Sequence, residues 1–192
     1  MRLKHGDAAP DFETVDLAVR TVRLAEWRGR HLLLSFFRYA SCPLCNLRIS
    51  ELVRHHSELQ QQGLHIIAFF QSPPERLRQY AGRQDPPFPL VADPDHRIYR
   101  LYGVESSWSG FLKGVLRVGS LATATARGFL PGPMDGHKHL IPADFLIDAH
   151  QVIRKAYYGN DIGDHLPLAD IQQWLARASA GREILSDDSL ST

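Results

Sequence analysis

The chain has 192 residues, of which 44% are hydrophobic and 22% are charged, and its formal net charge is +1. This length suits one well-buried domain, and the near-neutral charge gives no signal for nucleic acid or acidic substrates as partners. The first residues, MRLKHGDAAPDF, lack the apolar core of a secretory signal, and no apolar stretch reaches the roughly 18 residues that span a membrane. We therefore expect a cytoplasmic protein, in which a structural disulfide is uncommon.

Hydrophobic patterning predicts alternating strands and helices. Apolar runs bounded by turn residues predict strands at residues 11–15, 21–24, 31–37, 64–70, 88–92, 145–147 and 152–157. Helical spacing of apolar residues predicts helices at residues 43–62, 74–81, 95–102 and 168–178. Residues 182–192 are polar, so we expect a domain at residues 1–181 followed by a disordered tail.

Both cysteines of the chain lie in one Cys-x-x-Cys motif, between an apolar strand and a helical pattern. Cys42 is predicted at the N-terminus of the helix, where unpaired backbone N–H groups and the helix dipole favour a thiolate. Cys45 lies one turn further and can attack a sulfur bound to Cys42. The motif therefore predicts dithiol chemistry, with Cys42 as nucleophile and Cys45 as resolving thiol. Half of a zinc site, which would need two further ligands, and two inert buried thiols are the alternatives.

The order of the predicted elements is a β-hairpin, a strand–helix–strand unit with the cysteine motif, a second β-hairpin and a closing helix. This order predicts an α/β thioredoxin-like fold of three layers. The segments HGDAAPDFETVD, LLLSFFRYASCPLC and PADFLIDAHQVIRKAYYG resemble the peroxiredoxin-like branch of the alkyl hydroperoxide reductase/thiol-specific antioxidant (AhpC/TSA) superfamily. The resemblance covers about residues 5–180 and implies an N-terminal hairpin and an insertion, about residues 106–141, before the last hairpin. It also implies a peroxide or disulfide substrate and a thiol reductant of thioredoxin or glutathione type, and we expect no cofactor.

The sequence departs from that family at the positions that bind peroxide. The family pattern P-x-x-x-T-x-x-C would place its proline at Ser35 and its threonine at Tyr39, and the family arginine would fall at Pro142. Arg38 or Ser41 can substitute for the lost donors, although Arg38 also fits a solvated charge at a strand end. Because preorganised donors stabilise cleavage of the O–O bond, we expect slow consumption of hydrogen peroxide and efficient disulfide exchange.

Two residues at the start of the last hairpin have alternative interpretations. Pro142 lies in the segment IPADF, which resembles the segment that carries the cis-proline of thioredoxins. A cis bond there would expose backbone for a substrate peptide, whereas a trans proline at a strand start is the ordinary case. Asp144 is interpreted either as a buried proton acceptor on the strand opposite the thiols or as an edge-strand carboxylate.

Two histidines, His137 and His139, precede the same strand. A histidine near this place resembles the third ligand of Sco-type copper chaperones, so Cys42, Cys45 and His139 are an alternative metal site that would suit Cu(I). A solvated loop without metal is the preferred interpretation. Histidines close to a thiolate could also lower its pKa or relay protons.

Residues 106–141 are the segment whose structure and role the sequence patterns predict least clearly. Apolar residues from Trp108 to Leu116 follow helical spacing, and Lys113 and Arg117 lie among the basic residues of the segment. We expect a lid over the site or a homodimer contact, because long insertions beside a site are commonly functional. A helix that caps its own core and a helix on a membrane surface are the weaker alternatives.

The whole sequence therefore predicts a thiol-based oxidoreductase that reduces hydroperoxides or protein disulfides with a Cys42–Cys45 pair. The expected catalytic residues are Cys42, Cys45, Tyr39, Arg38 and Pro142. The alternatives are a non-enzymatic redox sensor, in which residues 106–141 transmit the disulfide state to a partner, and a copper chaperone.

Overall fold

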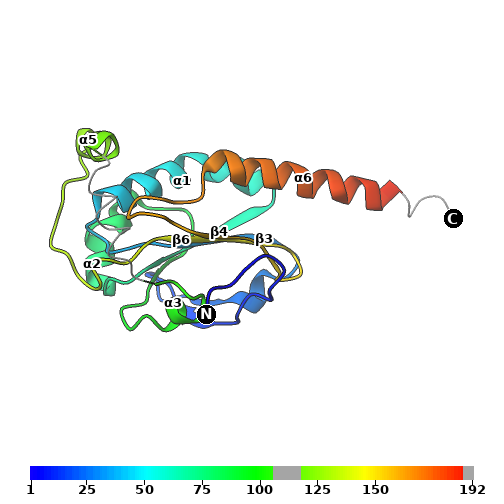
Figure 1. Cartoon of the computed structure of the whole chain (residues 1–192), viewed down its shortest axis with the longest axis horizontal. Helices are drawn as coiled ribbons and strands as arrows, with labels where there is room; N and C mark the ends of the chain where they lie inside the picture. The colour runs from blue at the N-terminus through cyan, green and yellow to red at the C-terminus, as the bar shows by residue number, and fades with distance from the viewer. Residues whose placement is uncertain (106–117, 188–192) are drawn as a thin grey trace.

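The computed structural model describes residues 1–105 and 118–187, and it places a central sheet between two layers of helices (Figure 1). The strands are β1 (Glu13–Val15), β2 (Thr21–Arg23), β3 (His31–Phe36), β4 (Leu64–Phe70), β5 (Leu90–Ala92), β6 (Ala143–Ile147) and β7 (Ile153–Tyr158). The α-helices are α1 (Pro43–Gln61), α2 (Pro74–Gln79), α3 (Arg97–Leu101), α5 (Val118–Ala126) and α6 (Leu168–Asp187). Two short 3₁₀ helices are η1 (Leu24–Trp27) and η2 (Ala81–Gln84).

The central sheet has five strands in the order β5-β4-β3-β6-β7. β3 pairs in parallel with β4 and antiparallel with β6, so β3 lies in the middle of the sheet. The continuous apolar run of β3 agrees with this position, because a central strand covered on both faces needs no polar side. β1 and β2 form the expected N-terminal hairpin as a separate antiparallel pair.

Side chains that alternate along the strands build a core on each face of the sheet. α1 and α6 cover one face, and α3 with the N-terminal hairpin covers the other (Figure 1). On β3, Leu33 faces α1 and α6, whereas Leu32 and Leu34 face the other layer. The cysteine helix α1 therefore packs on one side of the strand that leads into it.

The last helix differs from its expected boundary, and two other segments are not described. α6 ends at Asp187 rather than at residue 178. Residues 182–187 are therefore helical, which differs from the disordered tail expected for them. The predicted helix from Trp108 to Leu116 and residues 188–192 lie outside the described residues. Within the described ranges, no helix combines the length and the apolar character needed to cross a membrane.

Candidate active site

The cysteine motif begins where β3 has ended and α1 starts. Cys42 is the N-cap residue of α1, and Pro43 occupies the first helical position, where a missing N–H group costs no hydrogen bond. The Asn46 side chain donates hydrogen bonds to the carbonyl oxygens of Ala40 and Cys42 at 2.7 and 2.9 Å and fixes the turn before the helix. Cys42 and Cys45 are free thiols, and each is 1% exposed.

The two thiols have opposite protonation tendencies. A hydrogen bond from the Cys45 thiol lowers the pKa of Cys42 to about 6, against the opposing effect of burial. The charge of Arg38 and the backbone N–H groups of Leu44 and Cys45 lower it further. Burial raises the pKa of Cys45 well above its ordinary value, and its hydrogen bond to Cys42 and the charge there add to this rise. Cys42 is therefore the thiolate at neutral pH, and Cys45 is its protonated neighbour.

Arg38 contacts the Cys42 sulfur from the loop after β3. Its Nη1 donates a hydrogen bond to Cys42 Sγ at 3.7 Å, and its guanidinium lies 4.9 Å from the centre of the Tyr39 ring. Its Nη2 donates to the carbonyl oxygen of Lys138. Because Arg38 is only 1% exposed, the interpretation of this residue as a solvated strand-end charge is wrong.

Tyr39 begins the turn that leads to Cys42, and Ser41 lies within it, because the Cys42 backbone N–H donates to the Tyr39 carbonyl oxygen at 3.1 Å. Burial raises the pKa of Tyr39 to about 12, and the charge of Cys42 contributes to the same rise. The Tyr39 phenol therefore stays protonated at neutral pH and keeps an O–H donor. Ser41 donates its hydroxyl to the carbonyl oxygen of Pro133 at 2.6 Å, so this hydroxyl is engaged by the protein itself.

Pro142 lies at the start of β6, and its carbonyl oxygen accepts a hydrogen bond from the Gly159 backbone at 2.9 Å. No cis peptide bond occurs in the residues that the structure describes, so the cis alternative for Pro142 is wrong. Pro142 is an ordinary trans proline before a strand, where its missing N–H group removes no ladder hydrogen bond.

Residues 131–139, which we call the strap, lie across the residues around the cysteines. The strap is held mainly through its backbone, because Lys138, His137 and Pro133 all accept hydrogen bonds at their carbonyl oxygens. The donors and partners are Arg38 to Lys138, Ser41 to Pro133, Gln71 to His137 with a return bond from the His137 backbone, and Ser72 to the Asp135 carboxylate. Residues 131–139 of the expected insertion therefore contact the residues around the cysteines, and the lid and homodimer interpretations stay predictions.

Two glycines in the strap permit this close approach. A Cβ atom at Gly132 would lie 2.6 Å from the Tyr80 hydroxyl oxygen and 2.8 Å from Ser41 Cβ. Gly136 has a φ of 73° and lies directly against the Gln71 side chain. A larger residue at either position would push the strap away from the cysteines.

Asp144 is a buried anion on the face of the sheet that carries α1. It accepts hydrogen bonds from the Ser35 hydroxyl, from His165 Nδ1 at 3.0 Å and from the Leu166 backbone N–H at 2.7 Å. Burial alone would raise the pKa of Asp144, but the charge and hydrogen bond of His165, with the charge of Arg48, outweigh burial and lower it. Because β7 covers β6 at the sheet edge, the edge-strand interpretation of Asp144 is wrong.

We expect Asp144→Asn to destabilise the fold by about 3 kcal/mol, because the change leaves buried partners without their anion. The folded-state pKa of Asp144 is lowered, so its contribution is present above the unfolded-state pKa of about 3.9 and is lost as the pH falls through the lower folded-state pKa. Urea unfolding at pH 7 measures the loss. Asp95→Asn, at an exposed position, is the matched control and should change stability by less than about 0.5 kcal/mol.

The two strap histidines do not assemble a metal site with the cysteines. The His137 ring contacts the His96 ring with centroids 4.6 Å apart, and His139 is half-buried. Among the described residues, no group of three or more histidine, cysteine, aspartate or glutamate side chains is placed to hold a metal ion. The described structure therefore does not form the copper site of Cys42, Cys45 and His139.

We expect a pH-dependent difference in alkylation between the two thiols. In protein with both thiols reduced, iodoacetamide at pH 6.5 should modify Cys42 at least about tenfold faster than Cys45, because only the thiolate reacts and Cys42 has the lower pKa. Peptide mapping by mass spectrometry measures the two rates. Faster labelling of Cys45 at this pH would reverse the assigned roles.

Several residues around the site could not be found from the sequence. Asn46, Gln71 and Ser72 are buried polar residues that fix the cysteine turn and the strap. All three lie outside the Cys-x-x-Cys motif, and their neutral side chains form no recognisable sequence pattern. What distinguishes them from other polar residues is that they are buried, and this becomes known only from the folded structure.

Comparison with known proteins identifies related sequences and structures. The AhpC/TSA family matches residues 5–156 of the chain. Peroxiredoxin Bcp of Escherichia coli is 30% identical over 128 residues, which cover 65% of this chain and 82% of Bcp. The crystal structure of peroxidoxin BcpB from Mycobacterium tuberculosis has a TM-score of 0.65 at 17% identity and covers 93% of this chain and 98% of that chain. PrxQ of Xylella fastidiosa has a TM-score of 0.66 at 13% identity, covers 95% and 99% of the two chains, and shares the same fold.

Proposed function

Because this chain belongs to the AhpC/TSA family, we propose that its Cys42–Cys45 pair reduces a hydroperoxide through an intramolecular disulfide. The chain is a peroxiredoxin-like thiol oxidoreductase, and the family implies a peroxide substrate and a thiol reductant in general terms. A cytoplasmic location and a homodimer remain predictions from the sequence.

The observation that carries the proposal is the contact of Arg38 with Cys42. The guanidinium donates to the sulfur from a buried position, so a positive charge is fixed beside the reacting atom. Such a fixed donor stabilises the negative charge that develops as an O–O bond breaks. Arg38 thereby supplies the positive charge that the family pattern would have placed at Pro142. We therefore expect fast consumption of peroxide, in place of the slow consumption that the sequence alone predicts.

The reaction balances with the groups on the site. The Cys42 thiolate attacks one peroxide oxygen, the O–O bond breaks, and the leaving oxygen takes a proton, which gives a sulfenic acid and an alcohol or water. The protonated Tyr39 phenol and Arg38 are the donors that can hydrogen-bond the two oxygens. Cys45 then loses its proton, attacks the Cys42 sulfur and releases water as the disulfide forms. Two thiols of the reductant restore both cysteines and become a disulfide.

A steady-state assay with three substrates tests this proposal. Purified protein with a thiol reductant is given hydrogen peroxide, an organic hydroperoxide, or insulin with intact disulfides, and consumption of each is measured. We expect turnover of at least one peroxide at a higher kcat/KM than reduction of insulin. Reduction of insulin disulfides alone would instead support a disulfide reductase, the other activity that the sequence predicts for the Cys42–Cys45 pair.

The redox-sensor alternative uses the same pair of thiols. The strap contacts Arg38 and Ser41, so formation of the disulfide could change its position. Turnover with a reductant separates the two functions, because a sensor is oxidised once and consumes no peroxide beyond one equivalent.

A further inference from the structure

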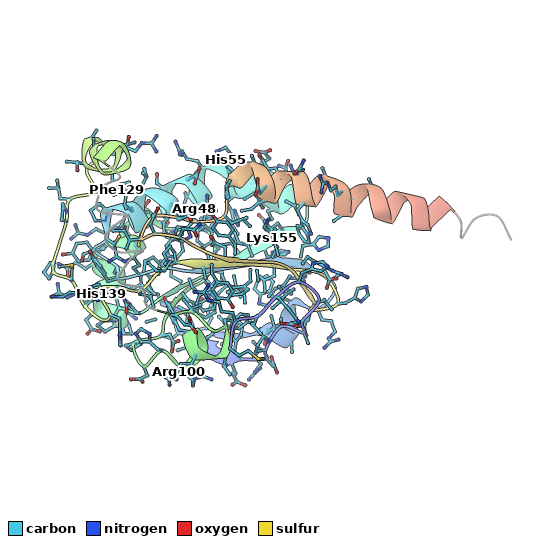
Figure 2. All side chains as sticks on the ribbon, in the orientation of Figure 1. Arg48, His55, Arg100, Phe129, His139 and Lys155 are labelled. Carbon is cyan, nitrogen blue, oxygen red and sulfur yellow. The ribbon has the colours of Figure 1, made fainter. Side chains whose placement is uncertain are left out.

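A cavity of about 570 Å³ lies beside the cysteine motif, on the side of the sheet that carries α1. It begins at Leu44, the residue just before Cys45, and follows the face of α1 through Arg48 to Arg54. Thr123 and Arg127 of the α5 region and residues 163–169 before and within α6 form its other walls. Figure 2 shows Arg48 on this side of the sheet and Arg100 on the opposite side. The volume suits a ligand of a few hundred daltons.

The lining of the cavity is positively charged. Three arginines, Arg48, Arg54 and Arg127, meet a single carboxylate, Glu51, which forms an ion pair with Arg48 at 2.5 Å. Arg54 and Arg127 are exposed, and neither has an ion-pair partner in the part of the chain that the structure describes. The cavity therefore presents two uncompensated guanidinium groups, which suit carboxylate groups of a ligand.

Two buried polar atoms in the lining residues also lack partners. The Arg48 side chain is 8% exposed and the His165 side chain is 6% exposed. One nitrogen of each side chain, Arg48 Nε and His165 Nε2, has no hydrogen-bond partner among the described residues. Buried polar atoms without a partner are uncommon, and here both belong to residues that line the same cavity. They indicate that a polar ligand completes this site.

The cavity lies beside the part of α1 that carries the resolving thiol, Cys45. Arg48 follows Cys45 by three residues on α1, so the two residues lie about one turn apart, with Cys45 buried and, unlike its neighbour Leu44, not itself part of the cavity wall. Leu44 and Leu47 give the cavity an apolar portion beside its arginines. A ligand held by the arginines would therefore lie along the side of α1 that leads to Cys45.

We propose that this cavity binds the carboxylates of a small acidic peptide thiol, which reduces the Cys42–Cys45 disulfide. The inference rests on the proposed function, because it names the reductant of that site. The thiolate of the ligand attacks Cys45 Sγ, a mixed disulfide forms, and the disulfide bond to Cys42 breaks. Cys42 leaves as a thiolate because the thiol of lower pKa is the better leaving group. A second thiolate attacks the ligand sulfur of the mixed disulfide, which releases the ligand disulfide, and Cys45 takes up a proton.

The test compares an acidic thiol with a neutral one on the full chain. Both cysteines are first oxidised with diamide, so the experiment does not depend on peroxide turnover. Reduction is then followed with glutathione, which carries two carboxylates, and with dithiothreitol, which carries none. The variant is Arg54→Ala combined with Arg127→Ala, both exposed positions that should leave the fold intact. Arg100→Ala, on the opposite side of the sheet, is the control (Figure 2).

We expect the double variant to be reduced by glutathione about tenfold more slowly than the unmodified chain, with an unchanged rate for dithiothreitol. S-methylglutathione, which has no free thiol, should slow reduction by glutathione in the unmodified chain and not in the variant. An unchanged rate for glutathione, or an equal loss with both thiols, would overturn the proposal. Failure of the proposed peroxide chemistry would show separately, as absence of the disulfide after peroxide treatment.

Discussion

Cys42→Ser is expected to abolish peroxide consumption, with a loss of more than about 10³-fold in kcat/KM. The hydroxyl of serine does not ionise at neutral pH, whereas the Cys42 thiolate is favoured by a hydrogen bond from Cys45 and by the charge of Arg38. The measurement is peroxide consumption with dithiothreitol as reductant.

Cys45→Ser is the matched control, because it keeps the nucleophile and removes only the resolving thiol. We expect this variant to consume about one equivalent of peroxide without forming an intramolecular disulfide, and to retain Cys42 as a sulfenic acid or as a mixed disulfide with an added thiol. Intact-mass analysis distinguishes these products. Undiminished peroxide turnover in Cys42→Ser would contradict the assignment of the nucleophile.

Arg38→Ala is expected to lower the rate of Cys42 oxidation by about 10²–10³-fold, the loss that is typical for removal of one preorganised donor. The change also removes a positive charge that lowers the pKa of Cys42, so this pKa should rise from about 6. In the unmodified chain, the rate should rise with pH and level off above the pKa of Cys42. In the variant, the inflection should move to higher pH, so the loss is larger at pH 6 than at pH 8.

Arg38→Lys is the control for this prediction. Lysine keeps the charge and should keep part of the low pKa, but it lacks the planar fork that bonds the Cys42 sulfur and the Lys138 carbonyl oxygen together. A rate between those of the alanine variant and the unmodified chain is therefore expected. Equal pH profiles for Arg38→Ala and the unmodified chain would show that Arg38 acts only on the strap.

Much of the fold could be predicted from local patterns. The apolar run at β3 and the spacing of apolar residues in α1 are strong signals, and the cysteine motif marks the junction between them. The motif also predicts which thiol is the nucleophile, because the helix terminus acts on Cys42 and leaves Cys45 one turn away. The lower pKa of Cys42 agrees with this prediction.

The surroundings of the motif depend on contacts between distant parts of the chain. Arg38 is buried because the strap closes over it, and its partner Lys138 lies 100 residues further along the chain. The same holds for Asp144, whose partners Ser35 and His165 belong to β3 and to the loop before α6. A single sequence shows the charge of these residues and not their partners. It could not decide between a buried and a solvated role for either one.

The most direct test of the account is the rate at which hydrogen peroxide oxidises reduced Cys42. Rapid mixing, followed by acid quench, alkylation and mass spectrometry, gives the second-order rate constant at pH 7. With Arg38 fixed beside the Cys42 sulfur, we predict a value above roughly 10⁵ M⁻¹s⁻¹, within the working range of enzymes. A value below roughly 10³ M⁻¹s⁻¹, equal in the unmodified chain and in Arg38→Ala, would contradict a peroxide-reducing site built from Cys42 and Arg38.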